Sequence, residues 1–213
     1  QEAKRLGIEI IAPDVNRSTA DFSVQEGAIV YALGALKGVG LAAMGHLEDV
    51  RRANGPFKDL YDVAERLDPK VVNKRCFEAL SKAGAFDAIE TNRARACASA
   101  DRLAAHCSAA NEARNSSQVS LFGASEAAMR PPLPSAPPWG PSERLDNEFS
   151  AIGFYLSGHP LDDLLKGEIK RRITLAHEIV EASRGRALFE MIGIVRARVE
   201  KTSRRGAKFA FVI

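Results

Sequence analysis

A glycine-rich string just before residue 41 has the residue types and the spacing of a phosphate-binding hairpin. Gly38 and Gly40 let the backbone pass close to a phosphate, and Val39 between them is expected to point inward and fix the hairpin. The amides that follow would donate to a nonbridging phosphate oxygen, with the positive end of a helix dipole behind them. Such contacts read the backbone and not the bases, which predicts sequence-independent, salt-sensitive DNA binding. The predicted contacts are Lys37, Gly38, Val39, Gly40, Leu41 and Ala42, and a plain turn between two helices is the alternative.

A second, weaker copy of this pattern lies downstream. Residues 73–82 read as a helix and 83–87 as a hairpin, and a further helix is expected from Ala88. Gly84 stands alone where the pattern has two glycines, so this copy is expected to be mainly the packing partner of the first. Its expected phosphate donors are Lys74 and Lys82.

A third motif lies in a segment rich in proline and serine. An exposed Leu121-Phe122 pair is unfavourable in water unless a partner buries it, and each side chain would contribute about 1.5 to 3 kcal/mol on full burial. The string Gln118, Val119, Ser120, Leu121 and Phe122 is therefore typical of a peptide that docks on another protein, with Gln118 bonded to the rim of the pocket. The alternative is that the two apolar side chains pack back on the helices of this chain.

The C-terminal stretch combines alternating apolar residues with positive charge. Residues 192–199 and 208–213 are predicted to form a hairpin through a turn at 203–207. Proteins bind single-stranded nucleic acid with basic grooves and aromatic faces, and Phe209 supplies one such face. The expected contacts are Arg204, Arg205 and Lys208, with Arg198 and Lys201 as further cations. A solvated basic loop is the alternative, because Phe209 and Phe211 alternate as core residues would.

The aspartate, histidine and cysteine residues that could take part in catalysis do not form a recognisable catalytic or metal-binding motif. Asp162 and Asp163 are adjacent and would face different ways on a helix, so they read as a solvated turn. His159 is a lone histidine without a carboxylate or cysteine companion, which favours a structural role. The three cysteines lack CxxC spacing, which argues against a disulfide framework and a cysteine zinc site. No catalytic residue and no metal-binding residue is predicted.

The elements that position these motifs are predicted to be mainly α with minor β. The 213 residues are 46% hydrophobic and 27% charged, as in a soluble globular protein, and no apolar run approaches the roughly 20 residues of a membrane span. The N-terminus carries no apolar signal core. Helical periodicity is found at 41–53, 57–67, 71–83 and 93–107, and strand-like pieces at 22–24 and 28–31. A helix capped by Ser142 is expected to run toward Phe154.

Seven strings in this order resemble the alpha subunits of bacterial DNA polymerase III, which are C-family replicative DNA polymerases. The strings are 14–18, 32–40, 55–57, 72–75, 82–87, 120–123 and 153–161, and the resemblance covers the whole chain. It implies that the chain is an internal to C-terminal fragment of such a polymerase. It further implies the end of the fingers region with a short β-hairpin at 1–32, a tandem helix-hairpin-helix DNA-binding domain at 33–107, a flexible linker with a clamp-binding motif at 108–142, a helical connector at 143–190, and the first strands of a truncated OB-fold at 191–213.

The resemblance also implies function. Residues 118–122 match the family's sliding-clamp motif, with Val119 in place of the commoner leucine. The family's nucleotidyl transfer uses Mg²⁺ held by palm aspartates that are not in this chain, so no cofactor is expected here. The implied partners are double-stranded DNA, single-stranded DNA at the OB strands, the sliding clamp and other replicase subunits, in the cytoplasm and without a membrane. Rival interpretations are a noncatalytic interaction scaffold and the same region of an error-prone C-family paralogue.

Overall fold

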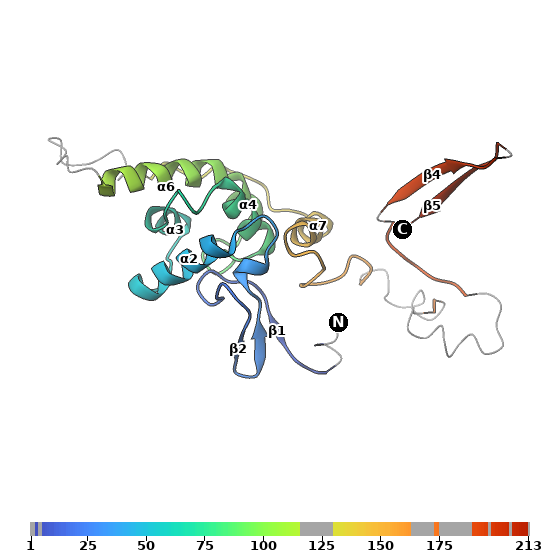
Figure 1. The fold of residues 1–213 in the computed structure, drawn as a ribbon, viewed down its shortest axis with the longest axis horizontal. Coiled ribbons are helices and arrows are strands. Elements are labelled where there is room, and N and C mark those ends of the chain that lie inside the picture. Colours follow the sequence, from blue (N-terminus) through green and yellow to red (C-terminus); the bar gives the residue numbers. More distant parts are fainter. Residues whose placement is uncertain are drawn as a thin grey trace. The chain divides into compact units, whose positions relative to one another are not determined.

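The computed structural model of the chain describes residues 3, 6–115, 130–162, 173–174, 189–195, 197–204 and 206–212 (Figure 1). The chain divides into two compact units, 1–158 and 159–213. The described elements are mostly helices with two small sheets, as the sequence predicts. Among the helices described, none is long and apolar enough to cross a membrane.

A three-stranded sheet precedes the helices of the first unit. Its strands are β1 (Ile10–Ile11), β2 (Ser23–Gln25) and β3 (Ala28–Val30), in the spatial order β1-β3-β2. β2 and β3 pair antiparallel as the predicted hairpin, and Glu26 and Gly27 at its turn both have positive φ, as a two-residue turn of this hand requires. β1 lies parallel to β3, so the chain crosses over between them.

The helical part begins with a 3-10 turn, η1 (Leu33–Ala35). The α-helices described are α2 (Leu41–Asn54), α3 (Leu60–Arg66), α4 (Lys74–Ala83), α5 (Arg93–Ala98), α6 (Ala100–Asn115) and α7 (Pro141–Ile152). Three of them begin at a side-chain cap, because Asp59, Asn73 and Asn92 each accept a hydrogen bond from an amide of the first turn. The helices predicted at 41–53, 57–67 and 71–83 are confirmed to within a few residues.

The helices after α4 differ from the prediction in two places. No helix starts at Ala88, because residues 84–89 form turns and α5 begins only after its cap, Asn92. The helix predicted over 93–107 is interrupted at Ser99, whose hydroxyl donates to the carbonyl of Arg95 at 2.7 Å. α6 then continues to Asn115, beyond the predicted boundary at residue 107.

The helix α7 begins two residues earlier than a serine cap would place it. Its N-cap is Gly140, without a side-chain hydrogen bond, and Pro141 occupies the first helical position, where its missing amide costs nothing. The expectation that Ser142 is the cap is therefore wrong. The helix ends at Ile152, because Gly153 adopts the left-handed conformation with φ of 99° and its amide donates to the carbonyl of Phe149.

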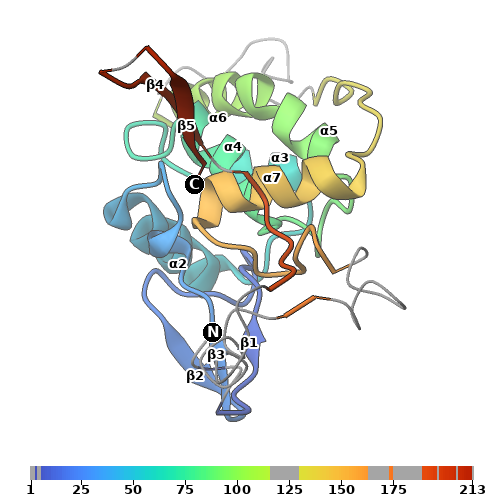
Figure 2. The ribbon, with the colours of Figure 1, turned by 90° about the vertical axis from the view of Figure 1, so that its right-hand side faces the viewer.

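One hydrophobic core holds the helices together. Its fully buried side chains include Leu33, Met44, Leu47, Phe77, Phe86 and Leu103. Although α7 follows the proline-rich segment, it contributes Ala151 and Ile152 to this core and lies beside α4 (Figure 2). The helix predicted to open a connector is therefore packed into the same body as the glycine hairpin.

Residues 130–140 pack against the helices, which differs from the flexible linker predicted over 108–142. The carbonyls of Pro131, Pro132 and Ala136 accept hydrogen bonds from side chains of α3, α6 and Asn92. Leu133 packs against the core. Proline removes a backbone donor but leaves the carbonyl acceptor, so an extended proline-rich segment can still be held by donors on its neighbours.

The second unit contains a hairpin whose second strand is where the sequence predicts it, whereas its first strand begins at Arg198 and not at residue 192. β4 (Arg198–Thr202) and β5 (Lys208–Val212) pair antiparallel, with Lys201 opposite Phe209. The turn is closed by hydrogen bonds between Ser203 and Ala207. The described residues of this unit show this two-stranded sheet and not the barrel of an OB-fold.

Candidate nucleic-acid interface

The glycine hairpin joins η1 to α2. Gly38 has φ of 86°, a conformation that favours glycine, whereas Gly40 has φ of −92° and is the N-cap of α2, without a side-chain hydrogen bond. The first amide to donate within the helix is that of Met44, to the carbonyl of Gly40 at 3.2 Å. The amides of Leu41, Ala42 and Ala43 come before it and so point out of the helix end, where an anion can accept from them.

The hairpin is exposed on the side where a phosphate would approach. Gly38, Gly40, Leu41 and Ala42 are exposed, and a Cβ at either glycine would meet no heavy atom of the described residues within 4 Å. Val39 points the other way and packs against the core, as predicted. The backbone from Gly38 to Gly40 is therefore accessible to a ligand on one side and packed against the core through Val39 on the other.

Lys37 fastens the hairpin to the end of α7. Its amide donates to the carbonyl of Ala151 at 2.7 Å, and its Nζ lies 5.7 Å from the centroid of the Phe149 ring. The ammonium also lies close to Gly153, where a Cβ would stand 2.9 Å from it. The cation thus lies near the negative end of the α7 dipole.

The second turn is arranged differently, because its backbone is covered. Gly84 ends α4 in the left-handed conformation, and the guanidinium of Arg93 occupies the space beside it, 2.1 Å from a Cβ placed there. Gly84, Ala85 and Phe86 are buried. The geometry agrees with the expected role of packing partner.

The two lysines predicted beside the second turn have different surroundings. Lys74 Nζ lies 2.8 Å from Asp101 Oδ2 and 3.6 Å from Glu78 Oε1, so its charge is paired within the protein. Lys82 forms no ion pair with the residues that the structure describes, and the same holds for Arg75, two turns earlier on α4. Arg75 is not among the contacts predicted from the sequence. Its seven-residue spacing from Lys82, which puts both on one helix face, is the signal that could have indicated it.

An ion-pair network that the sequence does not predict joins the second turn to α7. Arg93 donates to Asp87 at 2.7 Å and to Glu148 of α7 at 3.4 Å. The other oxygen of Glu148 accepts the amides of Leu156 and Ser157, each at 2.8 Å. Burial alone would raise the pKa of Glu148, but these hydrogen bonds and Arg93 favour the charged form, so its pKa lies below the ordinary value.

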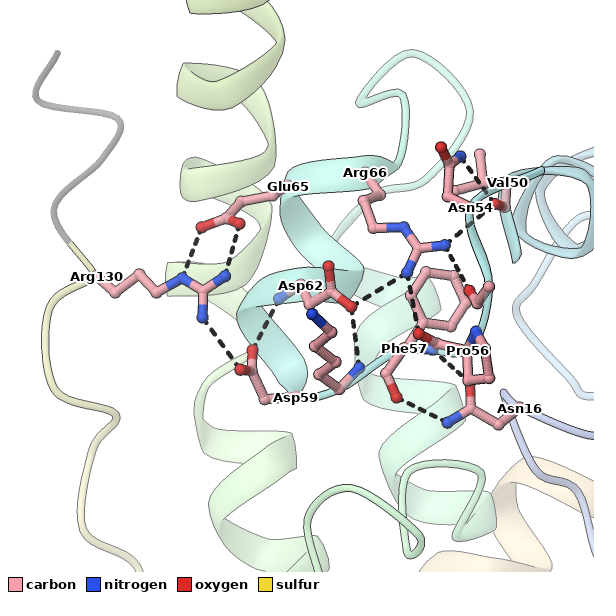
Figure 3. Close-up of polar contacts among 12 residues, drawn as sticks. Asn16, Val50, Asn54, Pro56, Phe57, Asp59, Asp62, Glu65, Arg66 and Arg130 are labelled. Atoms are coloured by element: carbon pink, nitrogen blue, oxygen red, sulfur yellow. Dashed lines mark hydrogen bonds and ion pairs between the residues drawn. The ribbon is translucent and has the colours of Figure 1, made fainter. Parts of the chain in front are cut away.

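The predicted peptide motif, Gln118 to Phe122, lies outside the described residues, but the segments on both sides of it bond to Glu65 of α3. Figure 3 shows the contact of the later segment, through Arg130. Arg114, at the end of α6, donates to the carbonyl of Glu65. Arg130 donates to both carboxylate oxygens of Glu65, at 2.8 and 2.7 Å, and to Asp59 at 3.0 Å. The guanidinium of Arg130 lowers the pKa of Glu65, against the effect of burial, and His106 lowers it further.

The C-terminal cations lie around an exposed hairpin. Lys208 begins β5 and Arg204 lies in the turn, whereas Arg205 lies outside the described residues. Phe209 and Phe211 stand edge to face with 5.5 Å between ring centroids, and Lys201 Nζ lies 5.3 Å from the Phe211 centroid. Cations and aromatic faces are therefore close together, as the sequence predicts.

Within the described part of the chain, no three histidine, cysteine, aspartate or glutamate side chains lie together as a metal site. His159 and Asp162 form a local turn, in which the His159 amide donates to Asp162 Oδ2 at 2.7 Å.

Comparison with known proteins gives one consistent result. Residues 7–96 match the family model described as the helix-hairpin-helix motif. The chain is 50% identical to the DNA polymerase III subunit alpha of Caulobacter vibrioides over 100% of its length and 19% of that protein. It is 34% identical to the same subunit of Vibrio cholerae (99% of the chain, 18% of the relative) and 38% identical to that of Thermus aquaticus (99% and 17%). The chain thus spans about a fifth of the length of the curated relatives it matches.

Proposed function

Because the chain belongs to the DNA polymerase III alpha-subunit family, as a homologue of about a fifth of the length of its members, we propose that it is the part of a DNA-directed DNA polymerase that binds the backbone of duplex DNA. The observation that carries this proposal is the open hairpin from Gly38 to Gly40 in front of α2, inside the region that matches the helix-hairpin-helix model. The nucleotidyl transfer and its Mg²⁺ are assigned to parts of the parent polymerase other than this chain.

The hairpin binds a phosphate mainly through backbone amides that point at it, with the helix dipole and one lysine adding positive charge. The first amides of α2 and the helix dipole contribute a partial positive charge of about half an elementary charge at the helix start, and Lys37 adds a full charge next to it. None of these groups reaches a base edge in this role, so the binding is independent of sequence and falls steeply with salt. A polymerase that advances along DNA needs this kind of contact.

The experiment that tests this function replaces Gly40. Aspartate is a favourable N-cap residue, and at Gly40 it meets open space at an ordinary φ, so Gly40→Asp keeps or raises the stability of α2. Its carboxylate stands where the phosphate would bind, so duplex affinity is expected to fall at least about tenfold at low salt. Fluorescence anisotropy with a labelled duplex measures this, beside a thermal melt of each protein.

Gly40→Ser serves as the matched control, because it also caps the helix but carries no charge. It is expected to bind duplex more tightly than Gly40→Asp. Equal binding by the wild type and Gly40→Asp would remove the hairpin from the DNA interface and favour a scaffold.

A finer part of the proposal is attachment to the sliding clamp through Gln118, Val119, Ser120, Leu121 and Phe122. It is supported by the match of these residues to the family's clamp motif. Residues on either side, Arg114 and Arg130, are bonded to Glu65, so a bound clamp would pull on a fixed part of the DNA-binding body.

The hairpin β4–β5 is proposed to be part of an OB-fold that binds single-stranded DNA. This is supported by Lys201, Lys208 and the exposed rings of Phe209 and Phe211, which supply a basic surface with aromatic faces. Arg204 and Arg205 at the turn would extend the basic surface.

A further inference from the structure

A groove lies where the glycine hairpin, α4 and the end of α7 meet. It has a volume of about 240 Å³ and is lined by Lys37 and Gly38 of the hairpin, Arg75, Glu78 and Lys82 of α4, and Ser150 of α7. The three elements are held together at this point, because the amide of Lys37 donates to the carbonyl of Ala151 at 2.7 Å and α4 packs on α7. The groove is therefore a fixed part of the fold.

The charge in the groove is positive. Lys37, Arg75 and Lys82 line it together with one carboxylate, Glu78. Glu78 Oε1 lies 3.6 Å from Nζ of Lys74, outside the lining, so part of its charge is already balanced. Arg75 is exposed, and neither Arg75 nor Lys82 forms an ion pair with the described residues. Two cations, two turns apart on one helix face, thus line the groove without an ion pair to the described residues.

We propose that this groove binds a second phosphate of the same DNA strand, next to the phosphate at the hairpin amides, with Arg75 and Lys82 as its donors. The inference rests on the proposed duplex binding and extends it from the hairpin to α4. Two features favour a backbone phosphate. Gly38 and Lys37 belong to both sites, so the groove continues the hairpin surface without a break, and a guanidinium fork beside an ammonium matches the oxygens of a phosphodiester.

This proposal gives α4 a phosphate-binding role, which the turn at Gly84 that follows it does not have. The second hairpin, at Gly84, is closed by Arg93, but the exposed face of the helix leading to it points cations into the groove. The amides that follow the Gly38–Gly40 hairpin would then bind one phosphate, and the side chains of α4 would bind the next phosphate of the same strand.

The test measures the salt dependence of duplex binding by the full chain and by the variant Arg75→Gln/Lys82→Gln. A labelled duplex of about 20 base pairs is titrated between about 50 and 200 mM salt. Loss of both donors to this one phosphate is expected to reduce the magnitude of the slope of log K against log salt by about 1 and to weaken binding at least tenfold at low salt. Both substitutions are at solvent-accessible positions of α4, and a thermal melt checks the fold.

Lys58→Gln is the matched control, because Lys58 is an exposed lysine that does not line the groove. It is expected to leave the slope nearly unchanged. If Arg75→Gln/Lys82→Gln gives the same slope as Lys58→Gln while Gly40→Asp still weakens binding, the proposed phosphate site in the groove is overturned. DNA binding by the hairpin is then retained. If the wild type itself shows no salt-dependent duplex affinity, both are overturned.

Two further measurements test the groove as a phosphate site of its own. Combining Gly40→Asp with Arg75→Gln/Lys82→Gln is expected to weaken duplex binding more than either change alone, because the two sites hold different phosphates. Inorganic pyrophosphate at constant ionic strength is expected to weaken duplex binding by the wild type more than by Arg75→Gln/Lys82→Gln, because a free anion and a strand phosphate compete for the same two donors. An equal effect on both proteins would overturn the proposal.

Discussion

At Gly84 the backbone has φ of 80°, and the Arg93 guanidinium fills the space that a side chain would need. Arg93 is held there by Asp87 and Glu148, so it cannot move aside without losing these partners. At Gly38, by contrast, the backbone also has positive φ but faces open space. The two glycines serve different purposes: one allows a buried cation to pack, and the other leaves room for a ligand.

Gly84→Ala is therefore expected to destabilise the fold by about 2 to 4 kcal/mol, from the left-handed backbone and the displaced ion pair together. Urea unfolding of the full chain measures this. Gly45→Ala is the matched control, because Gly45 lies inside α2 with nothing within 4 Å of its Cβ position. It is expected to stabilise by about 0.5 to 1 kcal/mol. A Gly84→Ala midpoint equal to that of the wild type would contradict the packing described for Arg93.

The sequence predicts the features of single residues correctly where neighbouring residues determine them. The spacing of Gly38, Val39 and Gly40 and the inward direction of Val39 follow from a few neighbouring residues, and the structure confirms this local geometry. The pairing of Arg93 with Glu148 spans 55 residues, and nothing near either residue indicates it. That pair, and the burial of Gly84 that depends on it, could only come from the structure.

Among the elements, α7 connects the two hairpins. Its last turn accepts the amide of Lys37 through Ala151, and its buried Glu148 holds both Arg93 and the amides of Leu156 and Ser157. The pKa of Glu148 lies below its ordinary value in the folded chain. A group with a lowered folded pKa stabilises the fold above its unfolded pKa of about 4.3, and this contribution is lost as pH falls through the folded pKa.

Glu148→Gln keeps an oxygen acceptor for the amides but removes the charge facing Arg93. The variant is expected to be about 2 kcal/mol less stable than the wild type at pH 7, and the difference should shrink as pH falls below about 4. Thermal melts at several pH values measure it. Glu143→Gln, at an exposed position in the first turn of the same helix, is the control and should show a much smaller change. The role given to Glu148 would be refuted by a stability difference that does not change with pH.

The sequence predicts α2, α3 and α4 well, because their apolar residues recur at helical spacing. It predicts the proline-rich residues 130–140 poorly. Residues 130–140 are rich in proline, which favours an extended chain without helix or sheet, but their carbonyls accept hydrogen bonds from Tyr61, Arg102 and Asn92. Those donors come from elements far away in the sequence, so composition alone could not indicate them. The same holds for the packing of α7, whose buried residues Ala151 and Ile152 are too few to form a pattern.

On the scale of the whole molecule, the proposed function has two attachments in one chain. Backbone contacts to DNA are weak at physiological salt, and a peptide that docks on a ring around the same DNA raises the effective concentration of the first contact. Arg114 and Arg130, on either side of the proposed clamp peptide, both bond to Glu65 of α3, and Figure 3 shows the Arg130 contact.

Replacing Gln118, Leu121 and Phe122 together by alanine is expected to weaken binding to the sliding clamp of the same cell at least about a hundredfold, since two apolar anchors are lost. Surface plasmon resonance with immobilised clamp measures it. Met129→Ala, in the same segment but outside the motif, is the control and should bind like the wild type. Clamp binding that survives the triple replacement would mean that the motif is incidental.

The position of Glu148 also has a consequence for biosynthesis. Arg93 leaves the ribosome 55 residues before its buried partner, and at roughly 5 to 20 residues per second the delay is on the order of 3 to 11 seconds. During this interval Arg93 has only Asp87 as its pair, and the core lacks Ala151 and Ile152. A nascent chain stalled before α7 emerges would therefore hold an incompletely packed helical body, which becomes complete only when the segment between α6 and α7 has also been made.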